Sequence, residues 1–214
     1  TIQEAIDYSI DGDTILVSAG TYYENINFNG KNIALIGEDR ETTIIDGGQN
    51  GSVVTIVNGE TLSLENLFIY NGRNGYDTGD AQYNYSGGGI ICNSNNGIIN
   101  LNIYNLIISN NFAEYLGGGL SSQSDNNVNI YNSIIENNES GQGGSGIYIS
   151  GQYQTDNSNY NIINTIINNN FTSQTNHRGG GIHASGGNYL IEDVTIANNQ
   201  ANVRGGGIYF SNES

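Results

Sequence analysis

The sequence predicts an all-β solenoid in which short strands wind into stacked parallel coils. Three observations lead to this prediction: an imperfect repeat marked by asparagine and glycine, alternating apolar residues within each repeat, and a composition that disfavours helices. The 214 residues include 37 Asn, 31 Ile and 31 Gly, and no proline, methionine or tryptophan. β-Branched and turn-forming residues both disfavour helix interiors, which excludes a helical bundle. No apolar run approaches the ~18 residues of a membrane-spanning helix, so we expect no membrane span.

The first element is a short capping helix over residues 1–10, which we expect to close the N-terminal end of the solenoid. Thr1 and Glu4 have the spacing of a capping box. Ile2 and Ile6 lie on one helical face and can cover the first coil. The sequence stops in mid-repeat without a second cap, so we expect a fragment of a longer chain with a further C-terminal domain, or end-to-end self-association.

Residues 11–61 are expected to form the first coils. Short apolar stretches in this region are separated by Gly, Asn and Asp, which is typical of strands joined by tight turns. The predicted strands cover residues 13–17, 32–36, 43–45 and 53–56.

Five further repeats occupy residues 62–214. Each begins with an eleven-residue segment in which positions one, three, six and eight face inward, as expected for two short strands. Position five is Asn or Asp and position ten is always Asn, which suits a bend because Asn tolerates left-handed backbone geometry. Asparagines stacked on successive coils can also form a hydrogen-bonded ladder. The segments begin at Leu62, Leu101, Val128, Tyr160 and Tyr189.

A glycine cluster and an apolar residue follow each segment after a loop of variable length. The cluster supplies another corner, and the residues after it supply a third strand. The spacing between equivalent asparagines is 39, 27, 32 and 29 residues, so the insertions occur at one corner of a regular coil. Three strands and three bends per coil describe a parallel β-helix. The clusters begin at Gly87, Gly117, Gly144, Gly179 and Gly205.

Two stretches carry a family resemblance. Residues 1–47 read TIQEAIDYSIDGDTILVSAGTYYENINFNGKNIALIGEDRETTIIDG and resemble the opening coils of pectin-lyase-like proteins, and the later repeats resemble the repeats of that superfamily. The resemblance implies one domain over residues 1–214 with a single-stranded right-handed parallel β-helix fold. The glycine clusters, with Asn-Phe at residues 111–112 and 170–171, are also similar to repeats of polymorphic outer-membrane autotransporters.

The resemblance does not imply an activity, because this fold serves lyases, esterases, hydrolases, tailspikes and adhesins. Gly20, Tyr22 and Glu24 match the GxYxE opening motif of pectin methylesterases, a stretch that also shapes a turn in β-helices without esterase activity. The esterase motifs QDTL, DFIFG and LGRPW are absent, and so are the Gly-His-Gly and Arg-Ile-Lys of polygalacturonases.

The chain is strongly acidic, with five basic and 21 acidic residues and a formal charge of −16. Nucleic-acid binding depends on Lys and Arg, so we expect no nucleic-acid partner. An extracellular or bacterial cell-surface location fits this balance. Cys92 is the one cysteine, which excludes an intrachain disulfide, and we expect it to face inward and to be unreactive.

The strongest candidate ligand site combines two arginines with an aromatic column. Arg178 and Arg204 each precede a glycine cluster, so their backbones should lie about 4.8 Å apart on adjacent coils. Tyr148, His183 and Tyr209 follow successive clusters and face outward beside them. Aromatic rings stack on sugar rings and guanidinium groups bind carboxylates, so these residues are suited to an acidic glycan. The alternative is a ladder of half-exposed side chains without a ligand.

Two weaker candidate sites remain open. His183 has the reach and pKa of a general base, with Arg178 and Arg204 beside it, although the pattern supplies no partner carboxylate. Asp77 and Asp80 lie in the longest insertion and could ligate calcium with nearby carbonyls, or form a solvated acidic loop. Calcium is the one cofactor that the sequence leaves open.

These features favour a non-catalytic secreted or cell-surface module, adhesin-like or contacting a polysaccharide or cell-surface glycan. The alternative is a polysaccharide lyase or glycoside hydrolase that acts on acidic glycans such as pectin. Ice binding is disfavoured because regular outward columns of threonine are missing.

Overall fold

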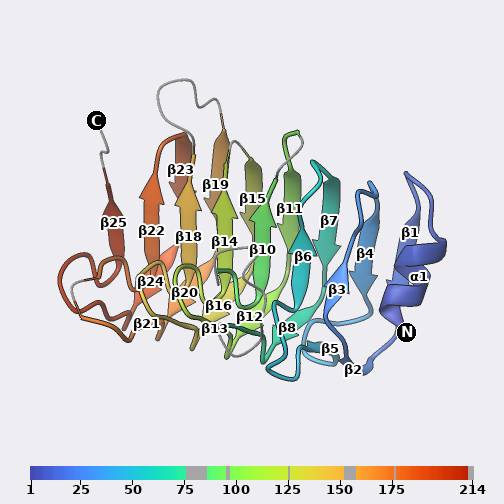
Figure 1. The fold of residues 1–214 in the computed structure, drawn as a ribbon, viewed down its shortest axis with the longest axis horizontal. Helices are drawn as coiled ribbons and strands as arrows, with labels where there is room; N and C mark the ends of the chain where they lie inside the picture. The colour runs from blue at the N-terminus through green and yellow to red at the C-terminus, as the bar shows by residue number, and fades with distance from the viewer. Residues whose placement is uncertain (76–85, 95–96, 125, 152–157, 176, 212–214) are drawn as a thin grey trace.

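The computed structural model describes residues 1–75, 86–94, 97–124, 126–151, 158–175 and 177–211. Figure 1 shows strands stacked side by side along the long axis, from the helix α1 (Ile2–Tyr8) at one end to the strand β25 (Ile208–Phe210) at the other. Consecutive strands of the chain lie in different sheets, and each strand pairs in parallel with its counterpart one coil away. This is the predicted right-handed parallel β-helix.

Three seven-stranded sheets form the walls of the solenoid. Sheet A contains β1 (Thr14–Val17), β4 (Ala34–Gly37), β7 (Thr61–Glu65), β11 (Asn100–Tyr104), β15 (Asn127–Tyr131), β19 (Asn159–Ile163) and β23 (Asn188–Glu192). Sheet B contains β2 (Gly20–Tyr23), β5 (Thr43–Asp46), β8 (Phe68–Tyr70), β12 (Ile107–Ser109), β16 (Ile134–Glu136), β20 (Ile166–Asn168) and β24 (Thr195–Ala197). Sheet C contains β3 (Ile26–Asn27), β6 (Val54–Ile56), β10 (Ile90–Asn93), β14 (Leu120–Gln123), β18 (Ile147–Ser150), β22 (Ile182–Ser185) and β25 (Ile208–Phe210).

A fourth, narrow sheet corrects the prediction of three strands per coil. Sheet D contains four two-residue strands, which are β9 (Arg73–Asn74), β13 (Phe112–Ala113), β17 (Glu139–Ser140) and β21 (Phe171–Thr172). Two residues are too few to produce an alternating pattern, so no periodicity predicts these strands. The predicted strands of the first coils are confirmed to within two residues at their ends, but β2 and β3 were missed.

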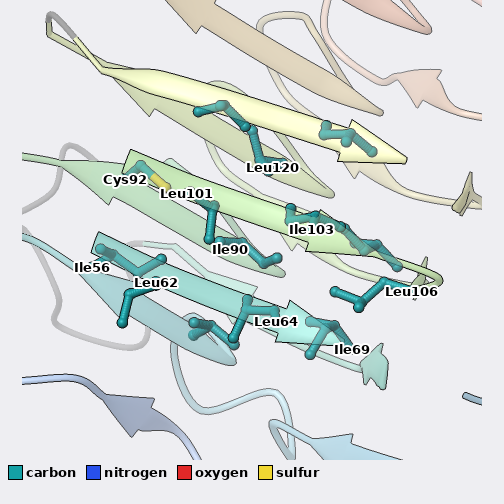
Figure 2. Close-up of a cluster of buried hydrophobic side chains, with 14 of the residues drawn as sticks. Ile56, Leu62, Leu64, Ile69, Ile90, Cys92, Leu101, Ile103, Leu106 and Leu120 are labelled. Atoms are coloured by element: carbon teal, nitrogen blue, oxygen red, sulfur yellow. The ribbon is translucent and has the colours of Figure 1, made fainter. Parts of the chain in front are cut away.

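The core is a continuous stack of aliphatic side chains between the sheets. Figure 2 shows Leu62, Leu64, Leu101 and Ile103 of sheet A pointing into the same interior as side chains of sheet C such as Ile90. The labelled side chains are at most 1% exposed. Burying each one fully contributes about 1.5–3 kcal/mol, so the inward positions of the repeat carry much of the stability.

The asparagine bends have the backbone geometry that the sequence predicts. The bend between sheets A and B has φ near +50° in every repeat, at Asn66, Asn105, Asn132, Asn164 and Asp193. The bend after sheet B also has positive φ, at Asn71, Asn110, Asn137, Asn169 and Asn198. A short side chain that bonds to local backbone lowers the cost of this left-handed conformation.

The continuous hydrogen-bonded ladder occurs one residue after the second bend, rather than at the first bend. The stacked side chains in this ladder are Asn111, Asn138, Asn170 and Asn199. The Nδ2 of each of the first three donates to the Oδ1 of the next, at 3.0, 3.1 and 2.9 Å in chain order. Each Nδ2 also donates to the backbone of sheet B, as Asn138 does to the Ile108 carbonyl at 2.9 Å. At the first bend, the two bonds from Asn105 to Asn66 and from Asn164 to Asn132 do not form a continuous ladder.

The glycine clusters are required by this buried ladder. The first glycine of each cluster has positive φ, for example +66° at Gly117. At the third glycine, a Cβ on Gly119 would lie 2.6 Å from the Gly146 carbonyl oxygen and 3.0 Å from Asn138 Nδ2. A side chain at that position would push the coils apart, so glycine and asparagine are coupled in each repeat.

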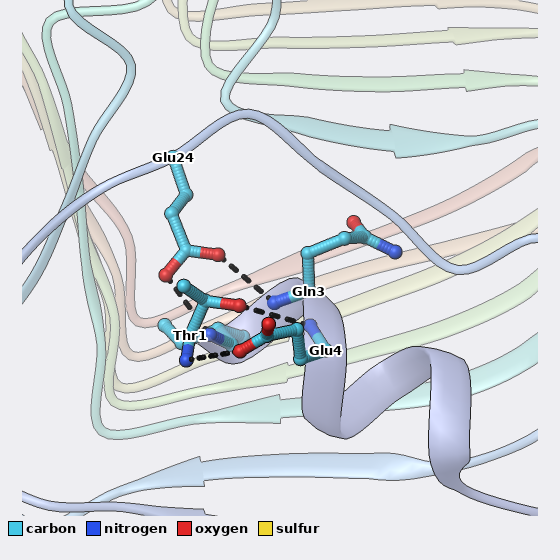
Figure 3. A network of polar contacts seen from close by, with 5 residues as sticks. Thr1, Gln3, Glu4 and Glu24 are labelled. Atoms are coloured by element: carbon cyan, nitrogen blue, oxygen red, sulfur yellow. Dashed lines mark hydrogen bonds and ion pairs between the residues drawn. The ribbon is translucent and has the colours of Figure 1, made fainter.

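The capping helix is held to the first coils by Glu24, the last residue of the GxYxE stretch. Figure 3 shows the Glu24 carboxylate accepting the backbone N–H groups of Ile2 and Gln3, both at 2.9 Å. The predicted capping box is present, with the Glu4 N–H donating to Thr1 Oγ1 at 3.1 Å. In this chain the GxYxE stretch therefore forms strand β2 and anchors the helix.

The Asn138→Ala variant should destabilise the protein by about 2–4 kcal/mol, because the loss of the amide removes its bonds to the Ile108 carbonyl and to Asn170 and leaves the buried Asn111 N–H without its acceptor. Urea denaturation measures this change. The matched control is Asn137→Gly, because Asn137 is exposed and glycine adopts its φ of +54°. Equal stability of both variants would contradict a structural role for the ladder.

The Glu24→Ala variant should release α1, because two hydrogen bonds to a charged carboxylate contribute about 1.5–3 kcal/mol each. Hydrogen exchange of the amides of residues 2–8 should accelerate, while exchange in sheet A should not change. The control is Glu4→Ala, which removes an exposed part of the capping box. Unchanged protection of the helix in Glu24→Ala would refute the anchoring role.

Candidate functional site

The candidate site lies on the outer face of sheet C, near its last strand. Tyr148, His183 and Tyr209 occupy one register position on β18, β22 and β25. The ring centroid of His183 lies 5.3 Å from that of Tyr148 and 5.0 Å from that of Tyr209, both in edge-to-face arrangements. The predicted aromatic column is therefore present, and its rings pack on one another.

The two predicted arginines lie beside this column. Arg178 and Arg204 form an isolated parallel bridge on adjacent coils, as expected from their positions before the glycine clusters. Arg178 turns onto Tyr209: Nη1 donates to the tyrosine hydroxyl at 3.0 Å, and the guanidinium carbon lies 5.1 Å from the ring centroid. Arg204 is exposed. The rotation of Arg178 onto Tyr209 relieves the repulsion that two stacked guanidinium groups would otherwise suffer.

Neither arginine has a carboxylate partner in the described part of the chain. Within those ranges, the one ion pair joins the N-terminal amine to Glu4 at 3.1 Å. The Arg178 Nε–H is buried and has no hydrogen-bond partner among the described residues. Buried donors are normally paired, so Arg178 retains unused hydrogen-bonding capacity. The half-buried guanidinium of Arg178 and the exposed one of Arg204 together suit an anionic ligand.

His183 is neutral at physiological pH. Burial, together with the nearby charges of Arg178 and His177, lowers its pKa to about 4. Its Nε2 lies 3.4 Å from Ser211 Oγ, and its Nδ1 is buried without a partner among the described residues. A neutral imidazole with this pKa is a weak base at pH 7.

The accessible part of the column is confined to the last coils. Ser121 and Ile91 continue the same register toward the N-terminus, and both are fully buried although they face away from the main core. Ile91 packs on Val57 in a small separate cluster. A ligand on this face therefore meets Tyr148, His183 and Tyr209, and not the earlier members of the column.

The other candidates from the sequence are a calcium site and a cysteine. Asp77 and Asp80 lie outside the described residues, so the calcium site stays a prediction. The described ranges contain no group of three or more His, Cys, Asp or Glu that could hold a metal ion. Cys92 faces inward and is fully buried, as predicted, and burial raises the pKa of its thiol, which makes it unreactive.

One groove was not predicted from the sequence. It has a volume of about 450 Å³ and lies along the bends between sheets A and B, lined by Asn105, Asn132, Asn164 and Asp193. Arg40 reaches over it and donates from Nη1 to the Asn132 carbonyl at 3.2 Å. The two residues are 92 positions apart, so no local pattern could have paired them.

Comparison with known proteins adds one family match. Residues 193–211 match the Chlamydia polymorphic membrane protein repeat. This segment contains the last bend, the glycine cluster after Arg204, and Tyr209. The expected similarity to autotransporter repeats is therefore confirmed for this repeat.

The other comparisons do not extend this result. No curated protein matches the chain. Among solved structures, a pectin methylesterase from carrot aligns with 100% of this chain and 85% of its own length, at 15% identity and a TM-score of 0.40. The parallel strand pairing itself establishes the fold. In the described part of the chain, no helix is long and apolar enough to cross a membrane.

The lowered pKa of His183 predicts a specific pH dependence of stability. The unfolded chain binds a proton at His183 as the pH falls below about 6.5, whereas the folded chain binds it only near pH 4. The free energy of unfolding should therefore fall between pH 6.5 and 4, by up to about 3 kcal/mol more in the wild type than in His183→Gln. Denaturation at several pH values measures the difference, and parallel curves for the two proteins would contradict the assignment.

Proposed function

We propose that this chain is a non-catalytic β-helix module, secreted or displayed at a cell surface, that binds an acidic glycan on the outer face of sheet C. The observation that carries the proposal is the contact of Arg178 with Tyr209, with Arg204 next to it and no carboxylate paired to either in the described residues. The ligand would take the place of the missing carboxylate partners.

The chemistry of the site supports an acidic sugar. Guanidinium groups bind carboxylates through two parallel hydrogen bonds, and tyrosine and histidine faces pack on pyranose rings. The chain has a formal charge of −16, so an acidic ligand is repelled by most of the surface and attracted only where arginines are exposed. This charge pattern favours a localised site over non-specific adhesion.

Two features support a binding role over catalysis. His183 is neutral at pH 7 and has no carboxylate within hydrogen-bond distance among the described residues, so it lacks the orienting partner of an efficient general base. Hydrolysis of a glycosidic bond by the usual route needs a pair of carboxyl groups across the scissile bond. No described Asp or Glu accompanies the arginines.

The surface location and the partners are part of the same proposal. The matched repeat comes from a polymorphic membrane protein family, which supports a surface or secreted location. A polysaccharide or cell-surface glycan is the partner that the arginines and the aromatic column would bind.

A glycan array with and without calcium tests the proposal, followed by titration of the acidic glycans that bind. Arg178→Ala should weaken binding about 10- to 100-fold, because a hydrogen-bonded charge pair contributes about 1.5–3 kcal/mol. Arg204→Ala should weaken it by a smaller factor, since Arg204 is more exposed.

The control is Arg40→Ala, which makes the same change in charge far from sheet C. Equal losses in Arg40→Ala and Arg178→Ala, or no binding to any acidic glycan, would contradict the proposal. The appearance of unsaturated uronate absorbance, lost in Arg204→Ala, would replace the binding module with a lyase.

A further inference from the structure

The outer face of sheet A carries a second, chemically different surface. Sheets A and C bury their inner faces in one core, so their outer faces point away from each other. The outward positions of sheet A form three columns along the solenoid, which we call the amide array. Its members are Thr61, Asn100, Asn127, Asn159 and Asn188; Ser63, Asn102, Asn129, Asn161 and Leu190; and Glu65, Tyr104, Tyr131, Ile163 and Glu192.

Hydrogen bonds fix the side chains of the central column. Asn129 Nδ2 donates to Asn102 Oδ1 at 2.9 Å, and Asn161 Nδ2 donates to Asn129 Oδ1 at 2.7 Å. A carboxamide has two N–H donors and two acceptor lone pairs, so each of these bonds uses only part of its capacity. The half-exposed amides therefore offer further donors and acceptors in a fixed orientation.

The neighbouring column repeats this arrangement. Asn127 Nδ2 donates to Asn100 Oδ1 at 2.9 Å, and the backbone N–H of Asn159 donates to Asn127 Oδ1 at 2.9 Å. Successive coils place equivalent amides about 4.8 Å apart. The result is a regular set of amides whose side-chain rotamers are already restricted before any ligand binds.

An aromatic pair borders the amides. The rings of Tyr104 and Tyr131 stack at a centroid distance of 5.0 Å and an interplanar angle of 10°. Tyr104 is 38% exposed, so the pair presents apolar surface beside the hydrogen-bonding columns. Amides beside aromatic rings suit a ligand with hydroxyl groups on apolar rings.

The central coils of the array carry no charged side chain, although the protein is strongly acidic. The outward positions of β11, β15 and β19 hold only Asn, Tyr and Ile, and carboxylates occur only at the two ends, at Glu65 and Glu192. A polyanion gains no ion pair on this face and is repelled by the net charge of −16. An uncharged polyhydroxyl polymer has the complementary character.

We propose that the amide array binds a neutral polysaccharide, with its hydroxyl groups bonded to the asparagine columns and its sugar rings against Tyr104 and Tyr131. A groove of about 320 Å³ continues the central column beyond Asn102, lined by Ser63, Ala34 and Thr14. The polymer therefore has a path along the solenoid axis. This site is independent of the acidic-glycan site on sheet C and uses none of its residues.

Pull-down with cellulose, β-1,3-glucan and chitin tests the proposal, with affinities measured on soluble oligomers of whichever polymer binds. The test variant is the double substitution Asn129→Leu with Tyr131→Ile. The same columns hold Leu190 and Ile163 in other coils, so both side chains fit the sheet. Affinity for the neutral polymer should fall at least tenfold, while the unfolding temperature should stay close to that of the wild type.

The reciprocal control uses Arg178→Ala, which should bind the neutral polymer as the wild type does. The double variant should in turn retain acidic-glycan binding, so the two sites fail separately. Absence of wild-type binding to all three polymers, or full binding by a folded double variant, would overturn the proposal. It would also be overturned if light scattering showed a dimer that the double variant abolishes, or if the face inhibited ice growth without binding a polysaccharide.

Discussion

The structure depends on the requirement that every coil hydrogen-bond fully to the next one. Backbone ladders satisfy this requirement in the sheets, and the buried asparagine ladder satisfies it at the corner where the backbone leaves sheet B. An unpaired buried amide at such a corner would cost about 1–3 kcal/mol in each coil. The ladder removes this cost. Glycine is needed opposite it because a Cβ there, as at Gly119, would lie 2.6 Å from the carbonyl oxygen of the next coil and 3.0 Å from the ladder amide. The absence of proline follows from the same requirement, since proline has no N–H to donate.

Most of the fold could be predicted because the repeat fixes which residues stack. Inward residues such as Ile103 and Ile130, and bends such as Asn105, recur in register and keep the same environment in every coil. Sheet D could not be predicted, because two residues per strand carry no period. The sequence also does not reveal which asparagine column forms the continuous ladder. The asparagine at the bend and the buried asparagine after it have the same side chain, and they differ only in the direction in which the backbone points that side chain.

The candidate site was predictable in its register and not in its contacts. Counting from the glycine clusters places Arg178 beside Arg204, and Tyr148 beside His183. The rotation of Arg178 onto Tyr209 depends on side-chain packing between different coils, which no sequence spacing encodes.

The burial of Ile91 and Ser121 in the same outward column depends on neighbouring segments, and so does the reach of Arg40 across to Asn132. The repeat period predicts which residues are neighbours along the stack, but it does not predict which outward side chains are buried by other segments.

The amide ladders also give the solenoid a direction. In the buried ladder each amide donates toward the C-terminal end, as Asn111 does to Asn138, whereas on the outer face of sheet A Asn129 donates back toward Asn102. The side-chain hydrogen bonds therefore run in opposite directions in the buried ladder and on the outer face of sheet A. A coil inserted into the stack in the reversed orientation would meet donor against donor on one side of the buried ladder and acceptor against acceptor on the other. The amide ladders thus oppose any reversal of a coil, in addition to the parallel backbone pairing.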